Sequence, residues 1–260
     1  MMELDQIRRE YSPNLQGRNV DILREYLQHE ILALIFASPY GPRYTFLGGT
    51  CCRLVYNSQR FSEDLNFDNE GLTPADFEAT AAYVKKGLEK LGYTVTLKFA
   101  CKGAFHCAIK FPGLLFDYTL SGHKEARLLI KLDTEKQHYA FTPTLARLQK
   151  FGVDTDLRAV PIDLLCAQKF AVALGRRRPK GRDFYDLRYL LARTPPDYGY
   201  LAQKFGIGGP EQLAARLNGH TAGFDFSALA HDVEPFLFDP DEAAGVARFG
   251  HDWPGLLAAA

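Results

Sequence analysis

Residue types that can bind phosphate gather where an apolar run gives way to two glycines. The apolar run ends at Leu47 and is followed by Gly48-Gly49-Thr50, with Arg53 three residues later. Glycines placed directly after a strand let backbone N–H groups approach an anion closely, and the N-terminus of a following helix adds partial positive charge. The stretch therefore predicts a cradle for phosphate, and Arg53 lies one helical turn behind it, where it can reach phosphate or pair with Asp64.

A second short run carries oxygen ligands at alternate positions. From residue 62 to residue 68 the even positions are polar, whereas Leu65 and Phe67 are apolar. Because residues two apart in a strand share a face, the polar side chains line up beside the cradle: Ser62, Asp64, Asn66 and Asp68. Mg²⁺ is bound by one or two carboxylates together with the phosphates of its substrate. The two runs together predict a site for a metal–nucleotide complex.

These runs resemble a known family, the AbiEii-type nucleotidyltransferases. They are toxins of type IV toxin–antitoxin and abortive-infection systems and belong to the DNA polymerase β-like nucleotidyltransferase superfamily. The family pattern is Gly-Gly-Thr, an arginine one turn later, and then Arg-Phe-Ser-x-Asp-Leu-Asp-Phe. The last part reads Arg60-Phe61-Ser62-Glu63-Asp64-Leu65-Asn66-Phe67 here. Asn66 departs from this pattern, which has aspartate at that position. An amide oxygen can ligate a cation but supplies no charge, so metal would be held more weakly, or as one ion rather than two.

A second family signature is a helix that carries a lysine among small apolar residues, followed by Arg-Asp-x-x-Asp-Leu. It matches Lys169, within Ala167-Gln168-Lys169-Phe170-Ala171, and the run from Arg182 to Leu187. Burying an ammonium is costly unless it meets an anion, so a triphosphate or a carboxylate is expected at Lys169. Asp183 and Asp186 share a helix face. One of these two aspartates is expected to orient Lys169 or Arg182, and the other to contact the nucleotide. For Asp183 the alternative is that it caps the helix and forms a structural ion pair.

The superfamily has a third carboxylate on a neighbouring strand. Asp133, which ends the apolar run from Leu128, is the first candidate and Asp117 the second. Its role would be that of a general base or a further metal ligand, and the alternative is an acid in the loop after a strand. Asp68 is a poor substitute, because in a strand of ~3.3 Å per residue it lies about 13 Å from Asp64.

Composition excludes a generally basic or disordered protein. The chain has 260 residues, 47% of them hydrophobic, and 31 Lys and Arg balance 31 Asp and Glu. Any nucleic-acid site must therefore be a local patch. The best candidate is the basic run between the two signature helices, Arg176, Arg177, Arg178 and Lys180, which is expected either to grip an RNA backbone or to be a solvated loop.

Localisation is predicted from the cysteines and the hydropathy. Five cysteines without a Cys-x-x-Cys pair fit a reducing cytoplasm better than a disulfide framework or a zinc site. No signal peptide is visible, and the most apolar stretch, 31–37, is too short to span a bilayer. We therefore expect a cytoplasmic protein with no membrane partner.

Periodicity predicts an α/β (α+β) fold in two parts. A nucleotidyltransferase domain over 1–159 is expected to hold a mixed sheet with flanking helices, and a helical domain over 160–260 to contribute to the active-site cleft. The expected helices begin at 19, 51 and 73 and form two further stripes at 164–174 and 182–191, and the expected strands cover 44–47, 64–67, 93–99, 105–111 and 127–133.

The resemblance implies a Mg²⁺- or Mn²⁺-dependent enzyme that transfers NMP from an NTP to an acceptor. The implied acceptor is the 3′ end of tRNA, and the implied partner is a cognate antitoxin. The catalytic set would be Asp64, Asn66, Asp133, Lys169, Asp183 and Asp186. Within it Asp64 and Asn66 would be the metal ligands, and the nucleotide would be held by Gly48, Gly49, Thr50, Arg53 and Ser62. Two alternatives stay open: a catalytically impaired NTP- or RNA-binding module, with Asn66 as the trace of that loss, and transfer of NMP to a protein or a small molecule.

Overall fold

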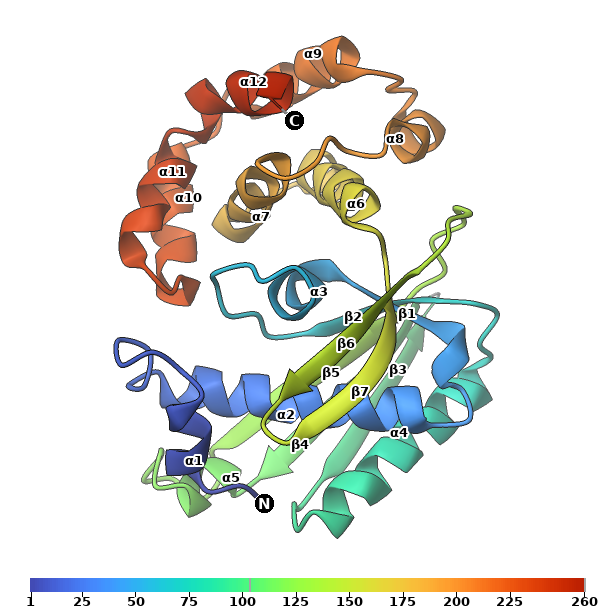
Figure 1. Ribbon diagram of the computed structural model, residues 1–260, viewed down its shortest axis with the longest axis vertical. Coiled ribbons are helices and arrows are strands. Elements are labelled where there is room, and N and C mark those ends of the chain that lie inside the picture. The colour runs from blue at the N-terminus through green and yellow to red at the C-terminus, as the bar shows by residue number, and fades with distance from the viewer. Residues whose placement is uncertain (103, 260) are drawn as a thin grey trace. The chain divides into compact units, whose positions relative to one another are not determined.

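The computed structural model describes residues 1–102 and 104–259 (Figure 1). The chain forms two compact units. Unit 1 comprises residues 1–55 and 61–159, and unit 2 comprises residues 56–60 and the chain from Val160 onward. The short segment 56–60 therefore belongs to unit 2, although its sequence neighbours on both sides belong to unit 1.

Unit 1 is built on a mixed sheet of seven strands within the described part of the chain, in the order β3-β4-β5-β2-β1-β7-β6. The strands are β1 (Tyr44–Leu47), β2 (Leu65–Asn69), β3 (Thr96–Lys102), β4 (Ala104–Pro112), β5 (Arg127–Thr134), β6 (Thr144–Lys150) and β7 (Val153–Ala159). Pairing is parallel between β2 and β5 and between β1 and β7, and antiparallel elsewhere. The prediction of an α/β protein with a mixed sheet is confirmed.

Two long helices cover one face of this sheet (Figure 1). Helix α2 (Asn19–Ala37) places Phe36 against Phe67 of β2, and α4 (Pro74–Lys90) places Phe77 against Phe105 of β4. Helix α4 starts as the sequence indicates, because Thr73 accepts a hydrogen bond from the Asp76 backbone N–H and Pro74 fits the first turn. The opposite face of β3, β4 and β5 carries alternating half-buried and exposed side chains.

Helix α3 (Gly48–Leu54) starts three residues earlier than predicted, so Gly48 and Gly49 form its first turn rather than a separate loop. Gly48 has φ +84°, which favours glycine, and a Cβ added there would lie 3.1 Å from the Asn66 side chain. Glycine at this position therefore lets β1 turn into α3 directly beside Asn66. The remaining short elements of unit 1 are α1 (Leu4–Arg9), η1 (Gly41–Arg43) and α5 (Leu114–Asp117).

The hairpin of β6 and β7 was not among the predicted strands. Its turn uses Phe151 at φ 58° and Gly152 at φ 78°. Arg147 pairs with Asp154 across the hairpin, and Leu148 and Leu157 face the core. Charged residues alternate with uncharged ones in β7, which is the pattern of a half-buried strand, whereas β6 has no such regular alternation.

Unit 2 is helical. Phe184 packs against Phe226 and Phe249 with ring centroids 5.2 and 5.1 Å apart, and Trp253 is fully buried. Its elements are α6 (Ile162–Gly175), α7 (Gly181–Leu191), α8 (Tyr198–Phe205), α9 (Pro210–Thr221), α10 (Phe226–Val233), η2 (Glu234–Phe236), η3 (Pro240–Glu242), α11 (Ala243–Ala247) and α12 (Phe249–Ala259). Across the described residues, none of the helices combines the length and apolar character that crossing a membrane requires.

Candidate active site

Three of the predicted site residues lie together on the exposed face of the sheet in unit 1. Asn66 of β2 pairs directly with Asp133 of β5, and Asp64 comes immediately before β2. Both carboxylates reach solvent, since the Asp64 and Asp133 side chains are 33% and 26% exposed. The parallel pairing of β2 with β5 thus brings together oxygen donors that are far apart in sequence.

Each carboxylate of this group has a cationic or titratable neighbour. The Lys131 Nζ lies 4.0 Å from an Asp64 oxygen, and the His106 Nδ1 lies 2.9 Å from an Asp133 oxygen. His106 stands opposite Asp133 in the pairing of β4 with β5. His106 therefore lies where it can orient the Asp133 carboxylate.

The donor set fits a single hard cation better than an all-protein cage. Within residues 1–102 and 104–259, no three His, Cys, Asp or Glu side chains form a cluster able to hold a metal ion. Two carboxylates and one amide oxygen are nonetheless the kind of partial set that Mg²⁺ completes with water and nucleotide phosphates. The residues present therefore fit a metal that arrives with its nucleotide.

The predicted nucleotide-binding turn is held against this group. The Thr50 hydroxyl donates a hydrogen bond to the Asp64 backbone carbonyl over 2.5 Å, and Thr50 is fully buried. Gly48 lies beside the Asn66 side chain, since a Cβ added at Gly48 would lie only 3.1 Å from it. Gly48, Gly49 and Thr50 are thus brought to the oxygen donors, although Thr50 directs its hydroxyl to the backbone rather than to solvent.

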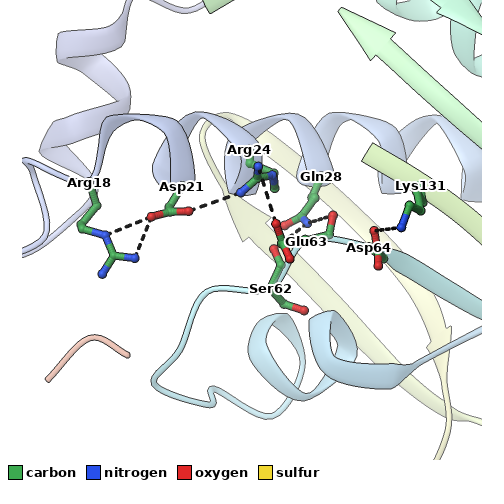
Figure 2. Close-up of polar contacts among 8 residues, drawn as sticks. All are labelled: Arg18, Asp21, Arg24, Gln28, Ser62, Glu63, Asp64 and Lys131. Atoms are coloured by element: carbon green, nitrogen blue, oxygen red, sulfur yellow. Dashed lines mark hydrogen bonds and ion pairs between the residues drawn. The ribbon is translucent and has the colours of Figure 1, made fainter. Parts of the chain in front are cut away.

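The segment that carries Ser62 and Asp64 is fastened to α2 (Figure 2). The Gln28 amide Nε2 donates to the backbone carbonyls of Ser62 and Glu63 over 2.9 and 3.0 Å. Arg24, which is also bonded to Asp21, lies 3.9 Å from the Glu63 carboxylate. Gln28 is 1% exposed, so it is a buried clamp on the irregular backbone that leads into β2.

Arg53 was predicted to bind phosphate or Asp64, and the structure pairs its guanidinium with Glu25 of α2, over 2.9 and 3.2 Å. Lys150 and the Tyr11 hydroxyl also bond to Glu25, over 3.1 and 2.8 Å. Burial opposes ionisation of Glu25, but the Arg53 and Lys150 charges outweigh burial and lower the Glu25 pKa to about 2. Arg53 is thus tied to the interior of unit 1.

Lys169 and Asp186 meet in unit 2, as the sequence suggested for a buried ammonium. The Lys169 Nζ lies 2.6 Å from an Asp186 oxygen, and Arg60 binds both Asp186 oxygens over 2.7 and 2.6 Å. Asp186 is fully buried. Burial alone would raise the Asp186 pKa, but the Arg60 and Lys169 charges reverse that effect and keep the pKa below its usual value.

Asp183 is also buried, and its carboxylate lies 3.2 Å from the Arg176 guanidinium. This contact is the structural ion pair that the sequence left open for Asp183. Arg177, Arg178 and Lys180 are exposed in the loop between α6 and α7. The structure therefore separates Arg176, which pairs internally, from the other three cations of the run.

The two substitute acids lie away from this group. Asp68 accepts a hydrogen bond from the Gln137 backbone N–H over 2.9 Å, and burial raises its pKa. Asp117 is exposed at the end of α5. Sequence reasoning missed Gln28, Glu25 and the ionic role of Arg60, of which only Arg60 had a signal, as the first residue of the family motif.

Most of the chain matches one known family. The model of the family described as nucleotidyl transferase AbiEii toxin of the type IV toxin–antitoxin system matches residues 30–207, more than half of the chain. No curated protein matches the chain significantly.

Two solved structures share the fold. JHP933 from Helicobacter pylori is 17% identical, with a TM-score of 0.53 over 92% of this chain and 93% of that chain. A candidate nucleotidyltransferase from H. pylori is 18% identical, with a TM-score of 0.54 over 91% and 96%. Identities this low show likeness of fold alone, whereas the family model covers both signature motifs. The chain therefore belongs to the AbiEii family of nucleotidyltransferase toxins from type IV toxin–antitoxin systems.

Proposed function

We propose that this nucleotidyltransferase transfers NMP from an NTP to the 3′ end of tRNA with Mg²⁺, or Mn²⁺ in its place, and that an antitoxin restrains it in the cell. The observation that carries the proposal is the meeting of Asp64, Asn66 and Asp133 on one exposed sheet face, beside the turn at Gly48. Family membership supports the nucleotide, the toxin role and the antitoxin partner.

In this proposal the oxygen donors hold the metal and the turn holds the nucleotide. Asp64 and Asn66 would bind Mg²⁺, which would neutralise negative charge on the phosphates when bound. The backbone at Gly48, Gly49 and Thr50 would lie along the triphosphate, and Ser62 would donate its hydroxyl to a phosphate oxygen. Positioning and neutralisation of charge supply most of the catalysis in phosphoryl and nucleotidyl transfer.

Asp133 is the proposed general base. It would accept the proton of the acceptor hydroxyl as the hydroxyl oxygen forms a bond to the α-phosphorus. The bond from the α-phosphorus to the bridging oxygen breaks, and pyrophosphate leaves. His106, 2.9 Å from Asp133, would keep that carboxylate oriented toward the reacting oxygen.

In the second motif Lys169 is proposed to supply positive charge, and Asp183 and Asp186 are proposed to hold cationic side chains in place. An ammonium has three donors, and one of the Lys169 donors is directed to Asp186. Asp186, being fully buried, would act as a positioning residue for Lys169 and Arg60. Asp183 is proposed to position Arg176 in the same way.

The test is incorporation of each α-labelled NTP into a total tRNA pool with Mg²⁺. We expect the wild type to label tRNA with a subset of the nucleotides and Asp64→Asn to lower the rate by about 100-fold or more. Asp117→Asn is the matched control, because Asp117 is an exposed acid of unit 1 outside the oxygen-donor group, and it should retain activity.

Each other outcome identifies a different function. Label on a protein or a small molecule, with none on tRNA, would show that the acceptor is that molecule rather than tRNA. Measurable NTP binding without label from any nucleotide would favour a catalytically impaired NTP- or RNA-binding module. The observation that favours this alternative is Asn66 in place of the family's aspartate. Equal loss in Asp64→Asn and Asp117→Asn would contradict the assigned site.

A further inference from the structure

The exposed face of β3, β4 and β5 forms ordered rows of side chains that lead to the oxygen-donor group. Lys98 of β3 stands opposite Ala108 of β4, and Ala108 stands opposite Lys131 of β5. Lys131 in turn reaches Asp64. Since neighbouring strands lie about 4.8 Å apart, the Cα atoms of Lys98 and Lys131 are separated by about 10 Å, with only a methyl group between them.

The neighbouring row adds a further cation. Lys110 of β4 lies between Thr96 and Leu129, one row away from Lys98. Among the residues that the structure describes, neither Lys98 nor Lys110 has an acidic partner within ion-pair distance, and Lys98 is exposed. Although acidic and basic residues are equal in number over the chain, these two ammonium groups therefore give this part of the face local positive charge.

The charged groups on this face change in sign along the sheet. Asp64 and Asp133 lie where β2 meets β5, Lys131 lies beside Asp64 on β5, and Lys98 and Lys110 lie on the strands beyond, β3 and β4. A nucleotide with its metal would neutralise the acidic end, whereas only an extended polyanion would use the basic end. This change of sign therefore matches a ligand whose reacting terminus sits at the acids and whose phosphates continue across the lysines.

We propose that the face carrying Lys98, Lys110 and Lys131 binds the phosphate backbone of the RNA acceptor and leads its 3′ end to Asp64 and Asp133. The assignment rests on the proposed function for the identity of the acceptor, but its electrostatic basis lies in unit 1 alone. Phosphate contacts of this kind set register and affinity without reading sequence. The Lys131 ammonium lies 4.0 Å from Asp64, and a metal held by Asp64 would leave that ammonium to a phosphate.

The test measures binding without any nucleotide transfer. Fluorescein-labelled bulk tRNA is titrated with Lys98→Ala/Lys110→Ala over a range of salt concentrations, and fluorescence anisotropy is recorded. The matched control is Lys86→Ala/Lys90→Ala, which removes two exposed lysines from α4, on the opposite side of the sheet. Circular dichroism melting confirms that each variant is folded.

We expect Lys98→Ala/Lys110→Ala, the face variant, to bind tRNA about tenfold more weakly than the control. The slope of log affinity against log salt concentration should become shallower by about 1.4, because each of the two lost phosphate contacts accounts for ~0.7. Equal affinities and slopes for the two variants would overturn the proposal. Failure of the transfer assay would leave this result unchanged, because the titration needs no NTP. Conversely, tRNA labelling by the wild type together with unchanged binding by the face variant would retain the proposed function and reject this surface.

Discussion

Asn66 is the residue at which this chain departs from its family pattern, and its neighbour suggests what the change does. It lies directly opposite Asp133 in the parallel pairing of β2 with β5. An aspartate there would set two carboxylates side by side, and like charges in this arrangement destabilise a sheet until a cation neutralises them. Asparagine keeps an oxygen ligand but removes the repulsion, so the stability of the fold depends less on a bound ion.

The substitution Asn66→Asp should therefore make stability depend on metal. Without Mg²⁺ we expect the variant to be less stable than the wild type by about 0.2 to 1 kcal/mol. With Mg²⁺ it should gain more stability than the wild type gains, because the folded state then binds the ion more tightly. Thermal melting with and without Mg²⁺ measures both effects.

The control for this experiment is Asn218→Asp, the same change at an exposed position of α9. It adds one negative charge to the chain without touching the oxygen donors. A Mg²⁺-dependent shift of equal size in the two variants would show that the ion acts on overall charge rather than at residue 66.

At the scale of elements, local pattern was enough to find most of unit 1. The strand at Tyr44–Leu47 and the start of α4 follow from alternation and capping, and the structure confirms both. The hairpin of β6 and β7 was missed because β6 lacks regular alternation and no Asn-Gly or Asp-Gly dipeptide marks the turn, although β7 alternates uncharged and charged residues. Helix α3 starts earlier than predicted because the sequence does not show that Asn66 packs against Gly48.

The site could be predicted only as far as its own motifs extend. Asp64 and Asn66 were chosen from the family motif, and Asp133 was chosen because it ends an apolar run where the superfamily has a third carboxylate. The sheet pairing places Asn66 opposite Asp133. Gln28 lies 34 residues from Ser62, and Arg60 lies 126 residues from Asp186. Contacts at such separations leave no periodic trace in the sequence, so the residues that hold the motifs could not be found without the fold.

Gln28 connects helix α2 to the motif, and this connection can be tested. Gln28→Glu keeps the side-chain shape but replaces the donating amide by a carboxylate that only accepts hydrogen bonds. The carbonyls of Ser62 and Glu63 then lose their donor, at a cost of about 1 to 3 kcal/mol in stability. We expect NMP transfer to slow as well, because the backbone before Asp64 is no longer fixed (Figure 2).

Urea denaturation and transfer assays would measure these two effects. Gln212→Glu is the matched control, because Gln212 is exposed and only accepts a hydrogen bond, from the Gly208 N–H, which a carboxylate can still do. If Gln28→Glu were destabilised yet transferred NMP at the wild-type rate, α2 would hold the fold without positioning the motif.

At the scale of the whole molecule, the chain passes from unit 1 to unit 2 and back within the family motif. Arg60 belongs to unit 2, where its guanidinium holds the buried Asp186, and the next residues belong to unit 1. Removing one partner from a buried ion pair is strongly destabilising. A fragment that starts at Val160 would lack Arg60, so the two units are not independent segments of the sequence.

The units can nevertheless be observed separately. Trp253 is the only tryptophan and is buried in unit 2, so its fluorescence follows that unit. Unit 1 contains a buried titratable network in which His29 of α2 hydrogen-bonds to the Glu25 carbonyl and packs against Phe151. Burial, aided by the nearby Lys150 and Arg53 charges, lowers the His29 pKa to about 4, against the raising effect of Glu25.

This depressed pKa predicts acid sensitivity of unit 1. The unfolded chain binds a proton at His29 near the ordinary pKa of about 6.5, whereas the folded chain resists that proton down to about 4. Stability is therefore fully present above pH 6.5 and falls as pH drops toward 4, by ~2.5 kcal/mol at pH 4.5. Glu25, with a folded pKa of about 2 against 4.5, adds its own loss only below about pH 4.5.

Urea denaturation at pH 8, 6.5 and 4.5, followed by circular dichroism with Trp253 fluorescence recorded in parallel, tests this prediction. His29→Gln should flatten the loss between pH 6.5 and 4.5, since a glutamine does not titrate and its amide can still donate to the Glu25 carbonyl. The exposed His123→Gln should keep the wild-type slope. If His29→Gln retained the full loss while Trp253 fluorescence followed it, the acid-sensitive group would lie in unit 2 instead.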